Sequence, residues 1–436
     1  MRVADYISER TTQQGVRHVF LVTGGGSMHL NDAFGRRPDL KYICCHHEQA
    51  LAMAAEAYAR ISGTLAVVNV TSGPGGINAL NGVFGAWVDS IPMVVVSGQV
   101  RRETTLSKND LIGKLRQLGD QEADIVGMVK GITKYAVTID DPHSIRYHLD
   151  RAFHLARHGR PGPCWIDVPV DVQGAQIVPE HLAAYDPAED EIVWETANLS
   201  IACDQALARL AAAARPVVYA GSGIRLSGCY HDFLTLIDRL GVPVVTAWNS
   251  NDLLWNDHPL FVGRPGSIGD RAGNFAVQNS DCLLMLGTRL NIRQVSYNWE
   301  NFAREAFKIA VDIDAEEMRK PTCAIDLAIH ADLRNVLPLM IHKSDAFTEN
   351  KSDWLQWCKQ RQRKYPVVLP EYWNTDASVN PYCFMELLFG QLAEGEVVVT
   401  GDGTACVTAF QAATIRRGQR LFHNSGCASM GYDLPA

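Results

Sequence analysis

Short apolar runs that end in glycine or polar residues recur along this chain and alternate with stretches of helical periodicity. In the first part of the chain these runs are HVFLVTGGG, YICCHH, LAVVNVTSG, IPMVVVSGQ and CWIDVPVDV. Strands that are apolar throughout are typical of a parallel sheet covered by helices on both faces. The pattern therefore predicts a doubly wound α/β domain over residues 1–178.

The same alternation returns after the acidic stretch PAEDEIVWETANLS, which we interpret as a linker. The runs RPVVYAGSG, VPVVTAWNS, DCLLMLGTR and FKIAVDIDA predict a second α/β domain over residues 195–345. A third α/β unit, expected over residues 375–436, contains GEVVVTGDGTACV and then reaches the last residue of the sequence. A domain of this type needs several more strands, so we expect the third domain to be incomplete in this chain.

Composition limits the classes of protein to consider. The chain has 436 residues, more than one hydrophobic core accommodates, and a net charge of −8 without a Lys/Arg run of the kind that binds nucleic acid. The longest apolar runs have strand length rather than membrane-spanning length. The eleven cysteines lack zinc-site spacing, and Cys44 and Cys45 are adjacent in what we expect to be a buried strand. We expect a reduced, cytoplasmic protein with inert core thiols and with neither nucleic-acid nor membrane partners.

The helical stretch that begins near His47 carries a carboxylate where one is costly. Glu48 shares its helical face with four apolar residues, namely Leu51, Ala52, Ala55 and Ala59. An ionised carboxylate on a core-facing stripe requires a compensating partner. Two explanations fit the spacing: an acid in the first helical turn that the helix dipole favours, or a buried carboxyl group with a functional role.

Two glycine-rich turns follow predicted strands of the first domain. VTGGGSMHL contains Gly25 and Gly26, and VTSGPGGINALNG contains Pro74 and Asn78. Each alone fits a tight strand-to-helix turn, and the first lacks the third glycine of a dinucleotide fingerprint. Because the carboxyl ends of parallel strands share one edge of a sheet, the two turns together favour a ligand crevice at that edge. Gln121 lies in a polar loop, QLGDQEADIVG.

In the second domain, GTRLNIR and VDID end strands with charged residues, among them Arg289 and Asp312. Arginine beside a glycine turn suits a phosphate-bearing ligand. These motifs are therefore typical of a nucleotide crevice.

Together these residues resemble a known family. HHEQALAMAAEAYARISG, VTSGPGGINALNGVFGAWVDSIPMVVVSGQV, DQEADIVG and GRPGPCWIDVPVDV are similar, in order and spacing, to the amino-terminal domain of acetolactate synthase-type thiamine diphosphate enzymes. GTRLNIR and VDID resemble the family's middle, flavin-binding domain, although Asn291 and Ile292 stand where the synthases usually carry acids. NSGCASMGYDLPA resembles the segment that opens the family's diphosphate-binding domain.

The resemblance implies a role for each candidate residue. Glu48 would contact N1′ of the cofactor's aminopyrimidine and share a proton with it, and Gln121 is the second expected catalytic residue. Pro74 and Asn78 would line the pyrimidine side, and Met430 would take the place of the bulky apolar residue that props the cofactor into its bent shape. The remaining expected cofactor contacts are Gly25, Gly26, Gly403, Thr404 and Ala405 for thiamine diphosphate, and Arg289 and Asp312 for FAD.

The resemblance also implies a metal ion and a second subunit. Mg²⁺ accompanies the diphosphate in the family, and its Gly-Asp-Gly motif follows the segment similar to MGYDLPA, whereas Asp402 precedes it here. We therefore expect the metal ligands to lie outside this chain. The two halves of each site come from different subunits in the family, which implies a homodimer or homotetramer.

The function implied is decarboxylation of a 2-oxo acid, pyruvate, and transfer of its two-carbon unit to a carbonyl acceptor. The acceptor is a second 2-oxo acid or a nucleotide-linked keto-sugar, since VTGGGSMHLNDAFG resembles enzymes that make branched deoxysugars. A simple 2-oxo acid decarboxylase or oxidase of the same family is one alternative. A non-catalytic nucleotide-binding regulatory protein is another, because a fold does not determine a function.

Overall fold

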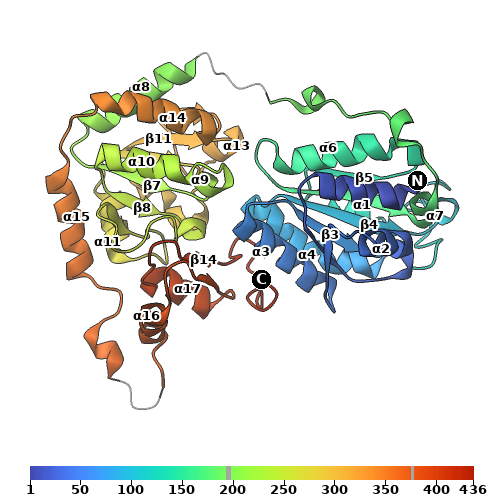
Figure 1. Cartoon of the computed structure of the whole chain (residues 1–436). Helices are drawn as coiled ribbons and strands as arrows, with labels where there is room; N and C mark the ends of the chain where they lie inside the picture. Colours follow the sequence, from blue (N-terminus) through green and yellow to red (C-terminus); the bar gives the residue numbers. More distant parts are fainter. Residues whose placement is uncertain (193–197, 375–377) are drawn as a thin grey trace. The chain divides into compact units, whose positions relative to one another are not determined.

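The computed structural model describes residues 1–192, 198–374 and 378–436. The chain divides into two compact units, which we call unit 1 (Met1–Ile192 with Gly426–Ala436) and unit 2 (Val193–Ser425). Figure 1 shows the elements of both units. The expected domain starts at 195 and 375 lie outside the described residues, so the three-domain division stays a prediction.

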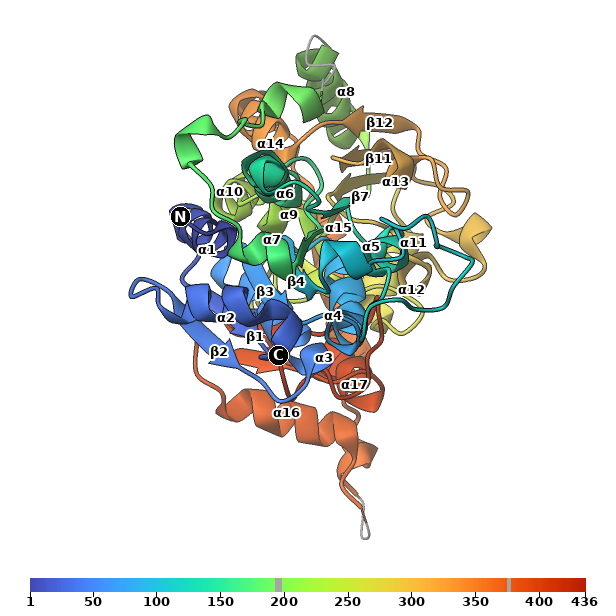
Figure 2. The ribbon, with the colours of Figure 1, turned by 90° about the vertical axis from the view of Figure 1, so that its right-hand side faces the viewer.

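Unit 1 is built on a parallel sheet in the order β2–β1–β3–β4–β6–β5 (Figures 1 and 2). This order confirms the predicted doubly wound α/β fold. Its strands are β1 (His18–Leu21), β2 (Lys41–Cys44), β3 (Ala66–Val70), β4 (Met93–Gln99), β5 (Tyr135–Thr138) and β6 (Pro163–Pro169). Its helices are α1 (Val3–Gln13), α2 (Met28–Gly35), α3 (Glu48–Ser62), α4 (Pro74–Asp89), α5 (Ile125–Val129), α6 (Ile145–Arg157) and α7 (Val170–Gly174).

Helices cover both faces of this sheet. The apolar sides of α1, α2 and α6 share one core with alternate strand residues such as Val67 and Val94. On the other face α3 packs against β1 and β3 and along α4. The two helices approach closely because Gly82 of α4 has no side chain: a Cβ there would lie 2.5 Å from the Cβ of Ala52 in α3. This close packing sets the positions of the two helices that carry Glu48 and Asn78.

Unit 2 contains a second parallel sheet, in the order β12–β11–β10–β7–β8–β9, which is the strand order of a Rossmann-type sheet. Its strands are β7 (Pro216–Ala220), β8 (Val244–Thr246), β9 (Phe261–Gly263), β10 (Cys282–Leu286), β11 (Phe307–Asp312) and β12 (Leu327–His330). Its helices are α8 (Leu199–Ala212), α9 (Gly223–Leu226), α10 (Tyr230–Leu240), α11 (Arg271–Gln278), α12 (Ile292–Val295), α13 (Ala315–Met318), α14 (Leu333–Lys343) and α15 (Ser352–Lys364).

A small parallel sheet, β13–β14, completes unit 2 together with two helices. These elements are α16 (Pro381–Gln391), β13 (Val397–Val399), α17 (Thr404–Ala412) and β14 (Arg420–Phe422). Arg264, fully buried at the end of β9, joins them to the larger sheet. Its guanidinium donates to the carbonyl of Ala413 at 3.0 Å and to Asn256 Oδ1 at 2.9 Å. Burial lowers the pKa of Arg264 to about 10, so the group stays charged at neutral pH.

Two expectations about strands need correction. We expected a buried strand at the adjacent cysteines, but β2 is an edge strand in which Lys41, Tyr42 and Cys44 are exposed. Eight of the eleven cysteines are buried, and Cys45 and Cys427 are half-buried. Strands β5, β9 and β12 were not predicted. All three lie at sheet edges, where strands are short and need no continuous apolar run.

Within the described residues, no helix is both long enough and apolar enough to cross a membrane.

Candidate active site

The carboxyl edge of the sheet in unit 1 has a crevice between β1 and β3. The chain leaves β1 toward β2 on one side and returns to β3 on the other, so the turns after β1 and β3 diverge. Gly24 and Gly26 pack directly against the second turn. A Cβ on Gly24 would lie 2.6 Å from Thr71 Cγ2, and one on Gly26 would lie 2.9 Å from Ser72 Cβ. Gly25, by contrast, faces open space.

Glu48 is the first residue of α3, at this same edge. Asn78 of α4 donates from Nδ2 to Glu48 Oε2 at 3.1 Å. The other carboxylate oxygen, Oε1, lies beside Gly75, where an added Cβ would be 3.6 Å away. No hydrogen bond to Oε1 is found within the described part of the chain. The carboxylate is thus oriented by one partner and keeps an acceptor for a ligand.

The expectation that Glu48 is buried was wrong in degree. Its position in the first turn leaves the side chain half-buried at the sheet edge. The apolar face itself is confirmed, since Leu51, Ala52, Ala55 and Ala59 are all buried. The fully buried acid of α3 is Glu56, two turns further along, which we did not single out. Its one available signal was an Arg four residues later, because such spacing places two side chains together.

Gln121 belongs to the loop that connects β4 to α5, and its side chain is exposed. Its backbone is left-handed, with φ of 65°, and its carbonyl lies so close to Gly73 that a Cβ there would collide with it. Glu122 holds this loop in place: its carboxylate accepts from Leu106 N at 2.6 Å and from Gly119 N at 3.1 Å. A carboxylate that binds several backbone N–H groups gives an irregular loop a defined shape.

These contacts bring four of the expected residues together. Pro74 is the first residue of α4, and Asn78 lies one turn further along the same helix. Gly73 and Gly75, on either side of Pro74, contact Gln121 and Glu48 respectively. Residues from three separate segments of the sequence therefore meet at the amino-terminal end of α4.

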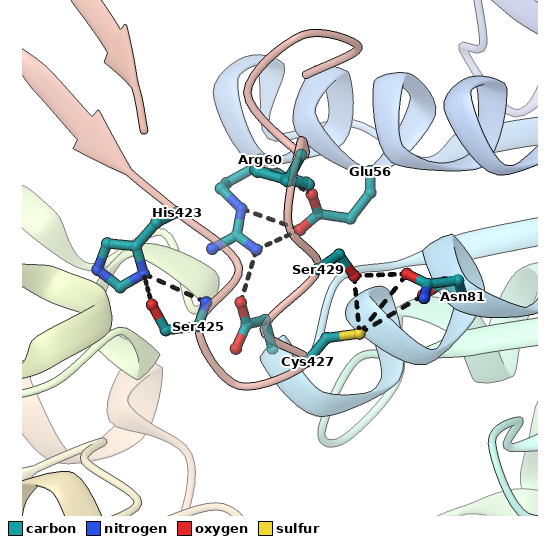
Figure 3. A network of polar contacts seen from close by, with 9 residues as sticks. Glu56, Arg60, Asn81, His423, Ser425, Cys427 and Ser429 are labelled. Atoms are coloured by element: carbon teal, nitrogen blue, oxygen red, sulfur yellow. Dashed lines mark hydrogen bonds and ion pairs between the residues drawn. The ribbon is translucent and has the colours of Figure 1, made fainter. Parts of the chain in front are cut away.

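Met430 lies in the last segment of unit 1 and its side chain is 83% exposed, which excludes an ordinary core methionine. The residues beside it are anchored. Ser429 Oγ donates to Asn81 Oδ1 of α4 at 2.5 Å, and the hydroxyl of Tyr432 donates to Glu56 of α3. Figure 3 shows Ser429 against Asn81, and Glu56 with Arg60.

The expected diphosphate turn belongs to unit 2. Gly403, with φ of 109°, precedes α17, and Thr404 and Ala405 are its first residues and exposed. At the end of the neighbouring strand β14, Ser425 Oγ lies 2.8 Å from His423 Nδ1 (Figure 3). The exposed N–H groups at the start of a helix favour an anion.

The second sheet also has a crevice at its carboxyl edge, between β7 and β10, where the strand order reverses. Gly223 and Gly287 pack backbone to backbone there, since a Cβ on Gly223 would lie 2.8 Å from the Cα of Gly287. Two buried hydroxyl groups at this edge, those of Thr246 and Thr288, have no hydrogen-bond partner within the described residues. Buried polar groups without partners are unusual in proteins and mark a place where a ligand is missing.

Arg289 and Asp312 lie at the same edge, but both already have partners. The Arg289 Nε donates to Glu317 Oε1 at 3.1 Å. Asp312 Oδ1 accepts from the backbone of Asp314 at 2.9 Å. A ligand phosphate at Arg289 would therefore share the guanidinium with Glu317.

Comparison with known proteins agrees with this geometry. Residues 1–128 match the family model for the thiamine pyrophosphate enzyme N-terminal TPP binding domain, and residues 203–340 match that for the central domain. The acetolactate synthase large subunit of Lactococcus lactis is 31% identical over 97% of this chain and 70% of its own length. The probable acetolactate synthase large subunit of Methanocaldococcus jannaschii is 31% identical over 100% of this chain and 72% of its own length.

The chain belongs to the acetolactate synthase family of thiamine pyrophosphate enzymes. A probable acetolactate synthase of Oryza sativa is 32% identical over 99% of this chain but only 64% of its own length. The chain thus spans about two thirds of the length of these family members, from 64% to 72%.

The residues of this acetolactate synthase relative fit the cofactors of the family to different extents. The open acceptor on Glu48 and the side-chain-free space at Gly25 suit an aminopyrimidine, also called the pyrimidine half of thiamine diphosphate. The two unpartnered threonine hydroxyls suit a nucleotide such as FAD in unit 2. No group of three or more metal-ligating side chains is found within the described residues.

A buried acid lies behind the Gln121 loop. Asp167 in β6 is 1% exposed and accepts from Ser97 Oγ at 2.6 Å, Gln99 Nε2 at 3.1 Å and Thr138 Oγ1 at 3.2 Å. The same Gln99 amide donates to the carbonyl of Ala123 at 3.0 Å. Burial raises the pKa of Asp167 to about 7, although the hydrogen bonds act in the opposite direction.

We predict that Asp167 makes the stability of this protein depend on pH. Its pKa of about 7 in the folded chain exceeds the 3.8 of an exposed aspartate, so the folded state holds this proton more tightly. The contribution is fully present below the unfolded pKa and is lost as pH rises through 7, by about 4 kcal/mol for roughly three pH units. Asp167→Asn should flatten the fall in unfolding free energy between pH 4 and pH 8, measured by urea denaturation. The change Asp110→Asn, at an exposed side chain, should leave the slope as in the wild type, and parallel curves for Asp167→Asn and wild type would contradict the prediction.

Proposed function

We propose that this protein is a thiamine diphosphate-dependent carboligase that decarboxylates pyruvate and transfers the two-carbon unit to a second 2-oxo acid. The observation that carries the proposal is the carboxylate of Glu48, oriented by Asn78 and left with an available acceptor beside two glycine turns. Membership of the acetolactate synthase family supports the reaction class.

Each residue of the edge has a defined task in this proposal. Glu48 holds or shares a proton with the ring nitrogen of the aminopyrimidine, and Asn78 keeps the carboxylate facing the ligand. Pro74 starts α4 without a backbone N–H group and so presents no competing donor. The exposed side chain of Gln121 is free to orient the substrate, since its backbone is fixed against Gly73. When bound, thiamine diphosphate supplies the electron sink for loss of carbon dioxide.

The balance of the reaction is simple. The bond between C1 and C2 of pyruvate breaks and carbon dioxide leaves. A new bond forms between that C2 and the carbonyl carbon of the acceptor, whose oxygen takes up one proton. There is no net oxidation or reduction, so the reaction requires no redox partner.

We predict that Glu48→Gln lowers turnover by about 10²–10⁴-fold, the usual size of an acid–base contribution, while the protein stays folded. The amide retains the shape and the bond from Asn78 but cannot exchange a proton. The measurement is the steady-state rate with saturating cofactor, alongside the thermal midpoint. Asp353→Asn is the matched control, because Asp353 is also an acid in a first helical turn, in α15. Equal and small effects of both changes would show that Glu48 serves only the helix dipole.

The acceptor is the second question that product analysis answers. With pyruvate alone we expect acetolactate as the main product, because a second pyruvate then serves as acceptor. Acetaldehyde or acetate as the only product would instead indicate a decarboxylase or an oxidase. The turn at Gly25 and Gly26 resembles that of keto-sugar carboligases, so a nucleotide-linked keto-sugar is the competing acceptor to include. A product that forms only with the keto-sugar would replace the 2-oxo acid in this proposal.

We further propose that unit 2 binds FAD in a structural, non-redox role. The Rossmann-type strand order, the glycine contact at Gly223 and Gly287, and the unpartnered hydroxyls of Thr246 and Thr288 support it. Arg289 and Asp312 would lie at the rim of this site. Since the reaction is redox-neutral, the flavin would contribute binding energy to the folded state rather than electrons.

We predict that Thr288→Val weakens FAD binding about tenfold without destabilising the flavin-free protein. Valine keeps the shape of threonine, and removal of a buried hydroxyl that lacks a partner costs the flavin-free state nothing. The measurements are flavin absorbance of the purified protein and an FAD titration. Thr235→Val, at an exposed position on α10, is the control. Wild-type protein that takes up no FAD, or equal affinity of Thr288→Val and wild type, would contradict the assignment.

The remaining parts of the proposal concern assembly and setting. We propose at least a homodimer, supported by the exposed apolar side chains of Ile77, Phe84 and Trp87 along α4. We propose that Mg²⁺ bridges the diphosphate through ligands that are not among these residues. We place the protein in the cytoplasm, supported by its cysteines, all of which are unbridged in the described structure.

A further inference from the structure

The segment Gly426–Ala436 presents one apolar side chain between two anchored ones. Ala428 and Gly431 have left-handed backbones, with φ of 63° and 86°, and the side chain of Met430 between them is exposed. A non-glycine residue with positive φ is uncommon and persists only when its surroundings enforce it. The anchors on either side of Met430 supply that constraint.

The first anchor is Tyr432, which is 1% exposed. Its hydroxyl donates to Glu56 Oε2 in the core beside α3. Burial and the charge of Glu56 raise the pKa of Tyr432 above its usual range, so the phenol keeps its proton and remains a donor. Arg60 binds the other oxygen of Glu56 at 2.9 Å and also donates to Asp89 Oδ2 of α4 at 2.8 Å (Figure 3).

The second anchor is Ser429, whose Oγ donates to Asn81 Oδ1 at 2.5 Å. Cys427 Sγ lies 3.8 Å from the same oxygen and 3.2 Å from Ser429 Oγ. Asn81 is three residues beyond Asn78 on α4, and Glu56 is eight residues beyond Glu48 on α3. The segment is therefore attached to the two helices whose first turns carry the proposed pyrimidine contacts.

We propose that Tyr432 and Ser429 are positioning residues that act through Met430, holding its side chain at a set place relative to α3 and α4 for contact with thiamine diphosphate. The buried Glu56–Arg60–Asp89 cluster is the fixed base of this latch. Such buried ionic clusters contribute little net stability compared with an apolar core, but they fix geometry because each member has defined partners. The inference rests on the proposed function, since it takes thiamine diphosphate as the ligand that Met430 contacts.

The test compares four variants of the full-length natural protein: Tyr432→Phe, Ser429→Ala, Met430→Ala and the double variant of Tyr432→Phe with Met430→Ala. Tyr147→Phe is the matched control, because it removes a 2.6 Å Tyr–Glu hydrogen bond, to Glu189, on the surface of the same unit. Two quantities are measured: amide hydrogen exchange of peptides covering 426–432 without cofactor, and the Kd for thiamine diphosphate with Mg²⁺ by calorimetry.

We expect faster exchange in 426–432 for Tyr432→Phe and Ser429→Ala, and no change for Tyr147→Phe. We expect a Kd about tenfold higher for Tyr432→Phe, the effect of losing one hydrogen bond to a charged group. The double variant should bind no more weakly than Met430→Ala alone, since effects that act through one side chain do not add. If Tyr432→Phe does not fold, Ser429→Ala with the same two readouts carries the test.

Three outcomes would overturn the inference. Unchanged exchange in 426–432 would show that the latch does not hold the segment. Faster exchange with wild-type Kd would reduce the latch to a structural role, and additive losses in the double variant would separate Tyr432 from Met430. Wild-type protein that binds no thiamine diphosphate would refute the proposed function itself, and with it the purpose of the latch, whatever the exchange shows.

Discussion

Both units depend on close backbone contact at the point where a parallel sheet changes direction. In unit 1 Gly24 and Gly26 lie against the turn after β3, and in unit 2 Gly223 lies against Gly287. A side chain at these positions would push the two turns apart and fill the crevice that each strand order creates. Because the turns touch without side chains, their backbone groups and the first residues of the following helices stay at the open edge. The candidate residues of both crevices are arranged around these contacts.

Helix α3 carries two carboxylates in different surroundings, and the difference follows from distance along the helix. Glu48 is in the first turn, where the sheet ends and a half-buried acid can face a ligand. Glu56, two turns deeper, is surrounded by core residues, and burial raises its pKa. A lone buried carboxylate would be costly, and the nearby Arg60 and the Tyr432 hydroxyl compensate it. One helix thus supplies both a reactive group at the edge and a fixed attachment in the core.

Much of the fold was predictable from local patterns, and the failures have physical causes. Central strands such as β3, β4 and β10 are apolar throughout because helices cover both of their faces. Edge strands β5, β9 and β12 lack that pattern and were not predicted, and β2 was predicted but is exposed. Of the candidate site, the glycine turns and the apolar face of α3 were predictable. The burial of Glu48 was overestimated because helical periodicity gives the direction of a side chain but not the depth of its turn.

The sequence by itself determined the alternation of strands and helices, the positions of the glycine turns and the family motifs, because these depend on neighbouring residues. Only the tertiary structure decided which polar groups meet. Asn78 reaches Glu48 across 30 residues, and Tyr432 reaches Glu56 across 376. Partners at such separations come together only when two helices pack at a set distance, as the Gly82 contact with Ala52 allows. Hydrogen-bond partners therefore depend on packing, which no local pattern encodes.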